Sequence, residues 1–259
     1  MKRILVWDAP VRLAHGVLAV LVLGAFALAT LTSDESVTFS WHAIAGLVAV
    51  VVVLLRILWG FFGTRYARFG DFPLRPSALV GYLRGVVSGR PDGSGVGHNA
   101  ATSWFALATF AGIVGLGVTG FLAGRGSEGA EEVHEVLAWS VIGLVAVHVA
   151  GVLLHVARKR ENLLAGMIDG RKVGSEADAI PGPRAATAVV SAALVIAFAA
   201  ALVSGFDAPS RRLKLPLVGT VVALGEAEAE GGRETTDGAG AEASGDERDE
   251  DGEDEDGDD

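Results

Sequence analysis

Five apolar stretches, each about 20 residues long, constrain this sequence more than any other feature. A helix needs about 20 mostly apolar residues to cross the hydrocarbon core of a bilayer. Hydrophobic residues make up 51% of the 259-residue chain. We therefore expect an all-α membrane protein with five spanning helices, which run over Leu13–Thr32, Trp41–Phe62, Trp104–Ala123, Val136–Val156 and Ala185–Phe206.

The C-terminal part of the chain differs from these spans. Leu215–Gly225 is apolar, but it is too short to cross a bilayer and contains Pro216, so we expect an interfacial or re-entrant segment. Glu226–Asp259 holds 17 acidic residues and two arginines, a net charge of −15, whereas residues 1–225 carry a net charge of +5. This tail is rich in Gly, Ala and acidic residues and has no aromatic residue, so we expect it to be disordered.

Charge in the connections predicts the orientation of the chain. The connections after the first and third spans contain one base, Arg125, and six acids. Cytoplasmic connections are enriched in Lys and Arg, so we expect a multi-pass protein of the inner (cytoplasmic) membrane with a cytoplasmic N-terminus and an external acidic tail. Fourteen bases lie at the N-terminus and after the second and fourth spans: Lys2, Arg3, Arg12, Arg65, Arg68, Arg75, Arg84, Arg90, Arg158, Lys159, Arg160, Arg171, Lys172 and Arg184.

The first span also has features of a secretory signal peptide. Lys2 and Arg3 precede it, and Ala27–Ala29 has the small residues of a cleavage site. Trp7 and Asp8, however, interrupt the approach to the apolar run. We therefore expect the segment to stay in the protein as a span.

Candidate ligands for a redox metal are few. The chain has no cysteine, which excludes disulfides, iron–sulfur clusters, zinc–thiolate sites and covalently attached c-type haem. It has six histidines and two methionines. Four histidines, His15, His42, His134 and His148, lie inside or at the edges of apolar spans, where ionisable residues are rare and usually functional.

The spacing of these histidines predicts two pairs. His134 and His148 are 14 residues apart, so they project from nearly the same face of one helix, about 21 Å from each other. Because successive spans alternate in direction, His148 matches His15 in the inner half of the bilayer, and His134 matches His42 near the outer face. A haem with two axial imidazoles needs two histidines on different helices that face each other across an apolar slot. Two stacked haem sites are therefore predicted, with packing histidines or a haem-free transporter of protons or metal ions as the alternatives.

A series of short motifs runs in order through residues 3–175. It comprises Val6–His15, His42 with Gly46, Arg56–Gly63, Tyr66–Phe69, Gly97–Asn99, Thr119–Phe121, His134 with Glu135, His148–Val152 and Arg160–Lys172. Through this series the chain resembles the bacterial cytochrome b561 family, also called the Ni/Fe-hydrogenase b-type cytochromes, which are membrane di-haem electron carriers. It departs from the family pattern at Gly16, where Trp is usual, and at Ala100–Ala101, where Pro and Leu are usual.

The resemblance implies two non-covalent haem b groups, one held by His15 with His148 and the other by His42 with His134. It also implies a four-helix haem-binding domain over residues 1–175. Residues 176–225 then add a fifth helix and the short apolar segment, and residues 226–259 form the tail.

The implied function is one-electron transfer between the quinone pool and a redox partner at the outer face, either a hydrogenase-like dehydrogenase or a cytochrome c. Electrons can run in either direction, and the chain is then a subunit of a respiratory oxidoreductase, with or without its own quinone-converting activity. A membrane anchor that only docks a partner enzyme is a further alternative. Lipid surrounds the spans, and no nucleic-acid partner is expected.

Two arginines are candidates for pairing with haem propionates. Arg56 lies 14 residues after His42, at the predicted depth of the inner haem, and Arg12 lies one turn before His15. A guanidinium suits bidentate pairing with a carboxylate, although either side chain can instead extend to the lipid headgroups.

The remaining two histidines have weaker assignments. His155 lies seven residues after His148 on the same helix face, so it competes with His148 as a ligand. Otherwise it is an interfacial residue. His98 lies in a Gly-rich inner loop, where we expect a solvated side chain, with quinone or proton chemistry as the alternative.

Overall fold

The structure, a computed structural model, describes residues 2–89, 96–159, 162–216 and 218–224. Arg90, Arg160 and the acidic tail from Glu226 onward, which entered the predictions above, lie outside the described residues. All described residues belong to one compact unit of the chain, Met1–Ala227.

The prediction of five spans is confirmed, because each span corresponds to a helix that is long and apolar enough to cross a membrane. Some helices begin before the apolar run does. The fourth spanning helix starts at Glu128, and its first turn carries Glu128 and Glu131, acids that interact favourably with a helix N-terminus. The five helices are α1 (Ala9–Leu31), α2 (Val37–Phe62), α4 (Ala100–Ala123), α5 (Glu128–Lys159) and α7 (Ala185–Ser204).

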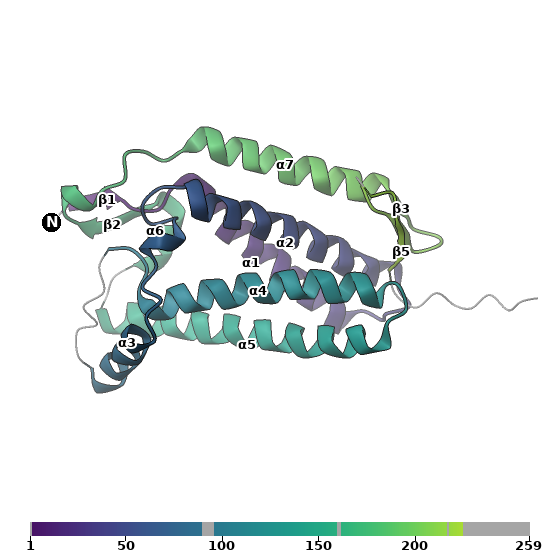
Figure 1. Ribbon diagram of the computed structural model, residues 1–259, viewed down its shortest axis with the longest axis horizontal. Coiled ribbons are helices and arrows are strands. Elements are labelled where there is room, and N and C mark those ends of the chain that lie inside the picture. The colour runs from purple at the N-terminus through teal and green to yellow at the C-terminus, as the bar shows by residue number, and fades with distance from the viewer. Residues whose placement is uncertain (1, 90–95, 160–161, 217, 225–259) are drawn as a thin grey trace, which may run out of the picture. The chain divides into compact units, whose positions relative to one another are not determined.

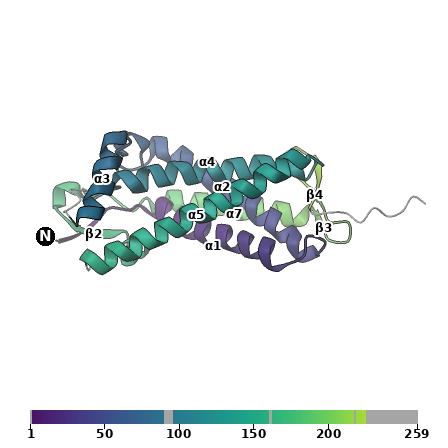
Figure 2. The ribbon, with the colours of Figure 1, turned by 90° about the horizontal axis from the view of Figure 1, so that it is seen from below.

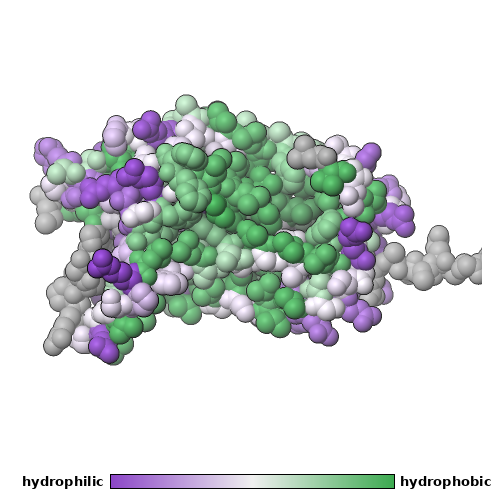
Figure 3. All heavy atoms as spheres, in the orientation of Figure 1, coloured by the Kyte–Doolittle hydropathy of each residue, from purple (hydrophilic) through white to green (hydrophobic). Residues whose placement is uncertain are grey.

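The surface of the helices is apolar in the middle and polar at both ends. The helices run side by side (Figure 1), and hydrophobic residues cover the middle of the face in view, while hydrophilic residues gather at its two ends (Figure 3). Large apolar side chains stay exposed along the helices; Val20 of α1 is 73% exposed and Ile196 of α7 is 68% exposed. An apolar surface of this extent is stable in a bilayer, where lipid tails cover it. The chain is therefore a multi-pass membrane protein.

Short elements close the two ends of the helix bundle. We call the end that carries the N-terminus the N-terminal end and the opposite one the far end. The N-terminal end has β1 (Lys2–Leu5), η1 (Phe69–Asp71), α3 (Pro76–Ser88), α6 (Leu163–Asp169), β2 (Arg171–Gly174) and η2 (Glu176–Asp178). The far end has one three-stranded sheet of β3 (Phe206–Asp207), β4 (Arg212–Lys214) and β5 (Val221–Ala223).

Antiparallel pairing of β1 with β2 joins the two ends of the stretch that carries the motifs. Gly170, just before β2, accepts hydrogen bonds from the backbone N–H groups of Val6 and Trp7 at 2.8 and 3.0 Å. Its φ of +77° is in the left-handed region, and a Cβ there would lie 2.5 Å from the Trp7 carbonyl oxygen. Only glycine fits this position without strain.

A buried carboxylate fixes the start of α1 against the end of α2. Asp8 is 1% exposed and caps α1 by accepting from the Val11 N–H at 3.0 Å. Its other oxygen accepts from Trp59 Nε1 at 3.0 Å and from the Thr64 hydroxyl at 2.7 Å. A buried carboxylate is tolerated when donors surround it in this way, so the cluster sets the relative height of α1 and α2.

The helix α3 runs across the direction of the long helices at the N-terminal end, in two views turned by 90° (Figures 1 and 2). It packs against α4, and Arg158 of α5 donates to the Val86 carbonyl at 2.7 Å. Val80 and Leu83 remain exposed on its other side. In a bilayer spanned by the long helices, α3 therefore lies along the membrane surface.

Of the two forms expected for Leu215–Gly225, an interfacial or a re-entrant segment, the re-entrant one is wrong. Within residues 218–224 this stretch forms β5, which pairs with β4 at the far end. Alternation along the strand turns Val222 and Leu224 inward, each 5% exposed, and the Ser40 hydroxyl of α2 donates to the Leu224 carbonyl at 3.1 Å. Strand pairing satisfies the backbone groups that a re-entrant segment would have to bury unpaired.

The fifth helix packs on one side of the bundle, against α1 and α2. Leu202 of α7 is fully buried and packs with Ile44 and Val48 of α2 and with Leu213 of β4. Leu202 lies in the last turn of α7, and just before the start of α7 the Pro183 carbonyl accepts from the Ala9 N–H at 2.7 Å.

We expect Asp8→Asn to lower the thermal stability of the protein, because the amide nitrogen cannot accept the hydrogen bonds that the second carboxylate oxygen accepts. A loss of about 2–4 kcal/mol is typical for breaking a buried charged network. Thermal denaturation of the purified protein in detergent measures it. Asp71→Asn, which removes one exposed ion pair with Arg68, is the control and should have little effect.

Candidate functional site

The structure brings His15 and His148 together. His15 lies in the second turn of α1 and His148 in α5, and their ring centres are 6.4 Å apart with the planes at 62°. His15 is exposed and His148 is half-buried. Neither ring makes a hydrogen bond within the described residues, although both lie in spanning helices. Unpaired imidazoles are costly in hydrocarbon, so this pair has the character of a binding site.

The structure also brings His42 of α2 and His134 of α5 together. Their ring centres are 6.0 Å apart, and the ring planes are at 78°. This pair lies toward the far end, 14 residues earlier on α5 than His148, or about 21 Å along the helix. Two facing pairs at two levels are thus present, as the spacing predicted.

Backbone carbonyls hold the rings of the far pair in place. His42 Nδ1 lies 2.8 Å from the Ala25 carbonyl oxygen, and His134 Nδ1 lies 3.1 Å from the Leu116 carbonyl oxygen. A carbonyl only accepts, so each Nδ1 carries the proton and each Nε2 keeps a free lone pair. A metal-ligating histidine is oriented by such a bond from its other nitrogen.

Residues that the sequence did not single out support these rings. The Thr119 hydroxyl donates to its own helix at Gly115 and lies 3.0 Å from His134 Nδ1, which makes it a second acceptor for that nitrogen. Phe105 stacks on His148, with ring centres 4.4 Å apart and planes at 11°. Phe39 stacks in the same manner on His42 at 5.5 Å.

The helices that carry the histidines leave room between them. α1 packs on α2, α2 on α4 and α4 on α5, whereas α1 and α5 are not closely packed within the described residues. Gly120 of α4 lets His134 approach, because a Cβ there would lie 3.1 Å from its Cε1. Side chains meet between α1 and α5, namely Phe26 with Trp139 at 5.2 Å and His15 with His148 at 6.4 Å between ring centres.

Arg56 lies near the end of α2, at the N-terminal end of the bundle, and is buried with 6% of its surface exposed. One Nη donates to the Ala67 carbonyl at 3.1 Å, and the guanidinium carbon lies 5.9 Å from the centre of the Phe69 ring and 5.7 Å from that of Phe110. The other Nη is buried and has no hydrogen-bond partner within the described residues. Arg56 therefore does not extend to the lipid headgroups, and one of its donors is unsatisfied.

Arg12 also has one guanidinium nitrogen that is bonded and one that is not. It donates to the Ile168 carbonyl in α6. Its Nε is buried and lacks a hydrogen-bond partner within the described residues. Both arginines thus bring an unsatisfied cationic donor into the N-terminal end of the bundle.

The expectation of a solvated His98 is wrong. Its ring centre lies 4.7 Å from that of Trp7 and 4.6 Å from that of Phe72. Burial, together with the positive charges of Arg56 and Lys172, lowers the pKa of His98 to about 3, although a backbone hydrogen bond at Tyr66 raises it. His98 is thus a neutral residue of the packed N-terminal end.

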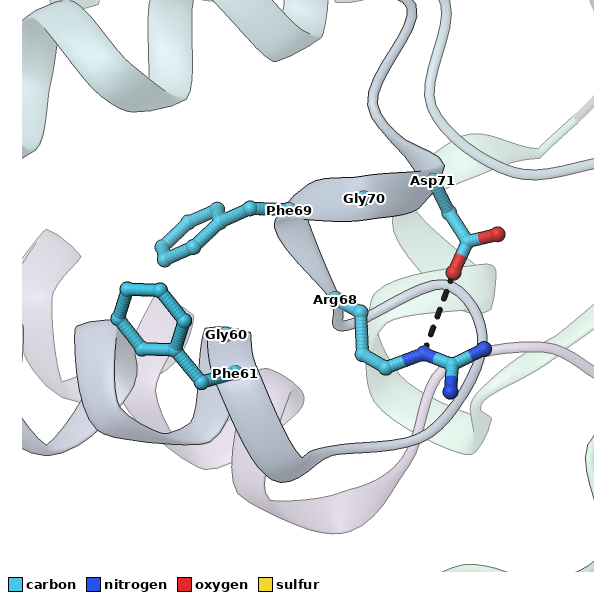
Figure 4. A pocket seen from close by; sticks show the side chains of 6 residues that line it. All are labelled: Gly60, Phe61, Arg68, Phe69, Gly70 and Asp71. Carbon is cyan, nitrogen blue, oxygen red and sulfur yellow. Dashed lines mark hydrogen bonds and ion pairs between the residues drawn. The ribbon is translucent and has the colours of Figure 1, made fainter.

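A surface cavity with a volume of about 470 Å³ lies beside the residues that support Arg56 (Figure 4). Phe61 and Phe69 meet edge to face at 5.4 Å, and Arg68 pairs with Asp71 at 3.3 Å. A Cβ on Gly60 would lie 2.3 Å from the Phe69 ring, so glycine lets Phe69 lie flat on α2 beneath Arg56. The lining of this cavity includes none of the four paired histidines.

His155 lies one heptad beyond His148 on α5 and is half-buried. The ring beside His15 is that of His148. The geometry therefore favours His148 over His155 as the partner of His15.

Comparison with known proteins agrees with this arrangement. A sequence profile described as prokaryotic cytochrome b561 matches residues 6–170, more than half of the chain. The chain belongs to the prokaryotic cytochrome b561 family. Comparisons with curated proteins and with solved structures gave no match. As a member of this family the chain is a membrane b-type cytochrome that binds haem b and takes part in electron transfer, which favours the cytochrome over the haem-free transporter.

The residues present fit a bis-histidine haem. With metal–nitrogen bonds of about 2 Å and about 1.1 Å from each nitrogen to its ring centre, two imidazoles on opposite sides of one metal have centres roughly 6.3 Å apart. The two pairs have centres 6.4 and 6.0 Å apart. The unsatisfied nitrogens of Arg56 and Arg12 are suitable donors for anionic propionates.

The motifs of this cytochrome b561 converge on the N-terminal end. Trp7 from the first motif packs on Tyr66 and on His98 from two later ones. The Trp7 backbone is bonded to Gly170 from the last. These parts of the motifs thus pack together at the N-terminal end of the bundle, where α1 begins and α2 ends.

We expect His98 to make the stability of the protein depend on pH. Its folded pKa lies below its unfolded value of 6.5, so the unfolded state binds the proton more tightly, and stability falls as the pH drops from about 6.5 toward 3. The measurement is the denaturation midpoint between pH 4 and 7. At pH 4 this effect is worth about 3 kcal/mol. His98→Gln should lose that part of the pH dependence; equal slopes for the two proteins would contradict the assignment.

Proposed function

We propose that this cytochrome b561 binds two haem b groups and carries electrons across the inner membrane between the quinone pool and a redox partner at the outer face. His15 and His148 hold one haem near the cytoplasmic face, and His42 and His134 hold the other near the outer face. The observation that carries the proposal is the presence of two facing imidazole pairs at two levels of one helix bundle. When bound, each haem iron supplies one-electron redox chemistry, and the bis-imidazole ligation and burial set its potential.

The proposed orientation of the protein in the membrane rests on the charged residues at the two ends of the helix bundle. The N-terminal end carries most basic residues of the described connections, among them Arg3, Arg65, Arg68 and Arg171, and basic connections stay in the cytoplasm. The far end carries Asp34, Glu35, Glu128, Glu131 and Glu132. It also carries Arg211, Arg212 and Lys214 on the hairpin after α7, so its surface is mixed rather than purely acidic.

The partner is a hydrogenase-like dehydrogenase or a cytochrome c. An outer-face partner must approach the far end, because His42 and His134 lie nearest to it. Acidic side chains of the first turns of α5, including Glu131 and Glu135, are exposed next to His134. They favour a partner with a basic surface near its own redox centre, since opposite charge speeds encounter.

We expect His148→Ala to leave one haem per chain instead of two, because the variant removes one axial ligand of the cytoplasmic-side haem only. Haem content per chain, measured from the absorbance of a pyridine extract, decides it. His155→Ala is the matched control on the same helix and should keep two haems. A His155→Ala protein with one haem, or a His148→Ala protein with two, would reverse the ligand assignment.

We expect Arg56→Gln to lower the midpoint potential of the cytoplasmic-side haem by about 40–60 mV, because removing a nearby positive charge favours the oxidised iron; this shift corresponds to about 1 kcal/mol for one electron. Redox titration of the two haem bands measures it. Arg65→Gln, an exposed arginine paired with Asp178, should leave both potentials within about 10 mV, since surface charges are screened. An unchanged potential in Arg56→Gln would remove Arg56 from the haem environment.

A further inference from the structure

An apolar groove lies between α7 and the bundle, toward the N-terminal end. Its volume is about 170 Å³. Ala14 and Val17 of α1, Trp59 of α2, and Ser191, Ala192 and Val195 of α7 are among its lining residues. The contacts that bury Leu202 hold α7 against the bundle closer to the far end, so the groove opens where α7 is less tightly packed. The residues matched by the family profile end at 170, and α7 is thus an addition that creates this groove.

Ser191 brings an unsatisfied hydroxyl into the groove. Thr30 and Thr119, in other spanning helices, donate to their own backbone at Phe26 and Gly115, at 2.9 Å each, whereas the Thr109 hydroxyl of α4 is buried without a partner among the described residues. The Ser191 hydroxyl makes no hydrogen bond within the described residues. A donor without an acceptor is costly at this depth in a membrane, and a ligand with a carbonyl or hydroxyl oxygen removes that cost.

We propose that the groove binds the ring of a lipid-soluble quinone. This inference rests on the proposed function and adds the place where the quinone binds. A quinone ring is flat and apolar, and it carries carbonyl oxygens that accept a hydrogen bond from Ser191. The isoprenoid tail stays in the lipid beside α7.

Other occupants fit less well. A phospholipid headgroup needs a cationic site at the membrane surface. Arg56 lines the groove, but it is only 6% exposed, and the other lining residues except Ser191 are apolar residues of spanning helices. A haem needs two facing histidines, and the groove has none among its lining residues. A volume of about 170 Å³ suits one substituted ring.

The groove lies close to the cytoplasmic-side haem site. Ala14 lines the groove, and the next residue, His15, faces His148 of α5. The two sites are thus on opposite sides of α1, separated by roughly the 10 Å diameter of one helix. A quinol in the groove loses two electrons and two protons; the electrons reduce the two ferric haems, one each, and the protons pass to water. Reduction of a quinone is the same step in reverse.

The test compares two neighbouring positions of α7. Ala192→Phe fills the groove, whereas Ala193→Phe adds the same ring at an exposed position outside its lining. We measure haem reduction by short-tailed ubiquinol and menaquinol analogues, with haem content and reduction by dithionite as readouts of the intact protein. Ala192→Phe should raise the KM for the quinol at least about tenfold, the effect of losing a fitted pocket contact, while Ala193→Phe stays within about twofold of the original.

Ser191→Ala provides a smaller change that does not alter packing. It should raise the KM about threefold to tenfold by removing one hydrogen bond, with haem content unchanged. If Ala192→Phe and Ser191→Ala both keep two haems and an unchanged KM, the quinone binds elsewhere and this inference is overturned, while the proposed function stands. A protein without two reducible haems would instead overturn the proposed function.

Discussion

The meeting of imidazoles from separate helices inside the apolar band is the constraint on which the rest of the structure depends. α5 supplies one histidine at each level, while α1 and α2 each supply one partner. Two of the four rings, His42 and His134, are fixed by backbone carbonyls, whereas His15 and His148 have no hydrogen bond within the described residues. An arrangement with unpaired imidazoles in lipid is stable only if those rings bind something, so the helix bundle and the cofactor depend on each other.

The N-terminal end explains how the first of these histidines is held at its depth. Asp8 ties the start of α1 to Trp59 and Thr64 at the end of α2. His15 follows Asp8 by two helical turns, and Arg56 precedes Trp59 by one, so the same cluster positions both. The buried carboxylate also offsets the positive charge of Arg56, which otherwise would be isolated in a region of low dielectric constant. The result is a packed base next to the pair of His15 and His148.

Much of this could be predicted from the sequence, because hydropathy and periodicity are local properties. Hydropathy gave the five spans, and the separation of His134 and His148 combined with alternating span direction gave the pairs. Contacts between distant segments could not be predicted: Phe105 on His148, or Thr119 beside His134, leaves no spacing signal. His98 was assigned to solvent because its neighbours are glycines, whereas Trp7, which covers it, comes from the other end of the domain. The re-entrant form expected for Leu215–Gly225 was wrong because the pairing of a strand depends on a partner strand, which hydropathy does not reveal.

The fifth helix can be understood from the same physics. A four-helix haem core presents apolar surface on all sides, and lipid satisfies it without further protein. An additional helix therefore gains little by burying apolar surface alone, since lipid tails are as apolar as its side chains. α7 is fully buried at Leu202, next to the far-end sheet, and nearer its start it carries Ser191, whose hydroxyl makes no hydrogen bond among the described residues. A helix retained for packing would have its small and polar residues satisfied along its length; α7 instead leaves space beside α1, the helix that carries His15.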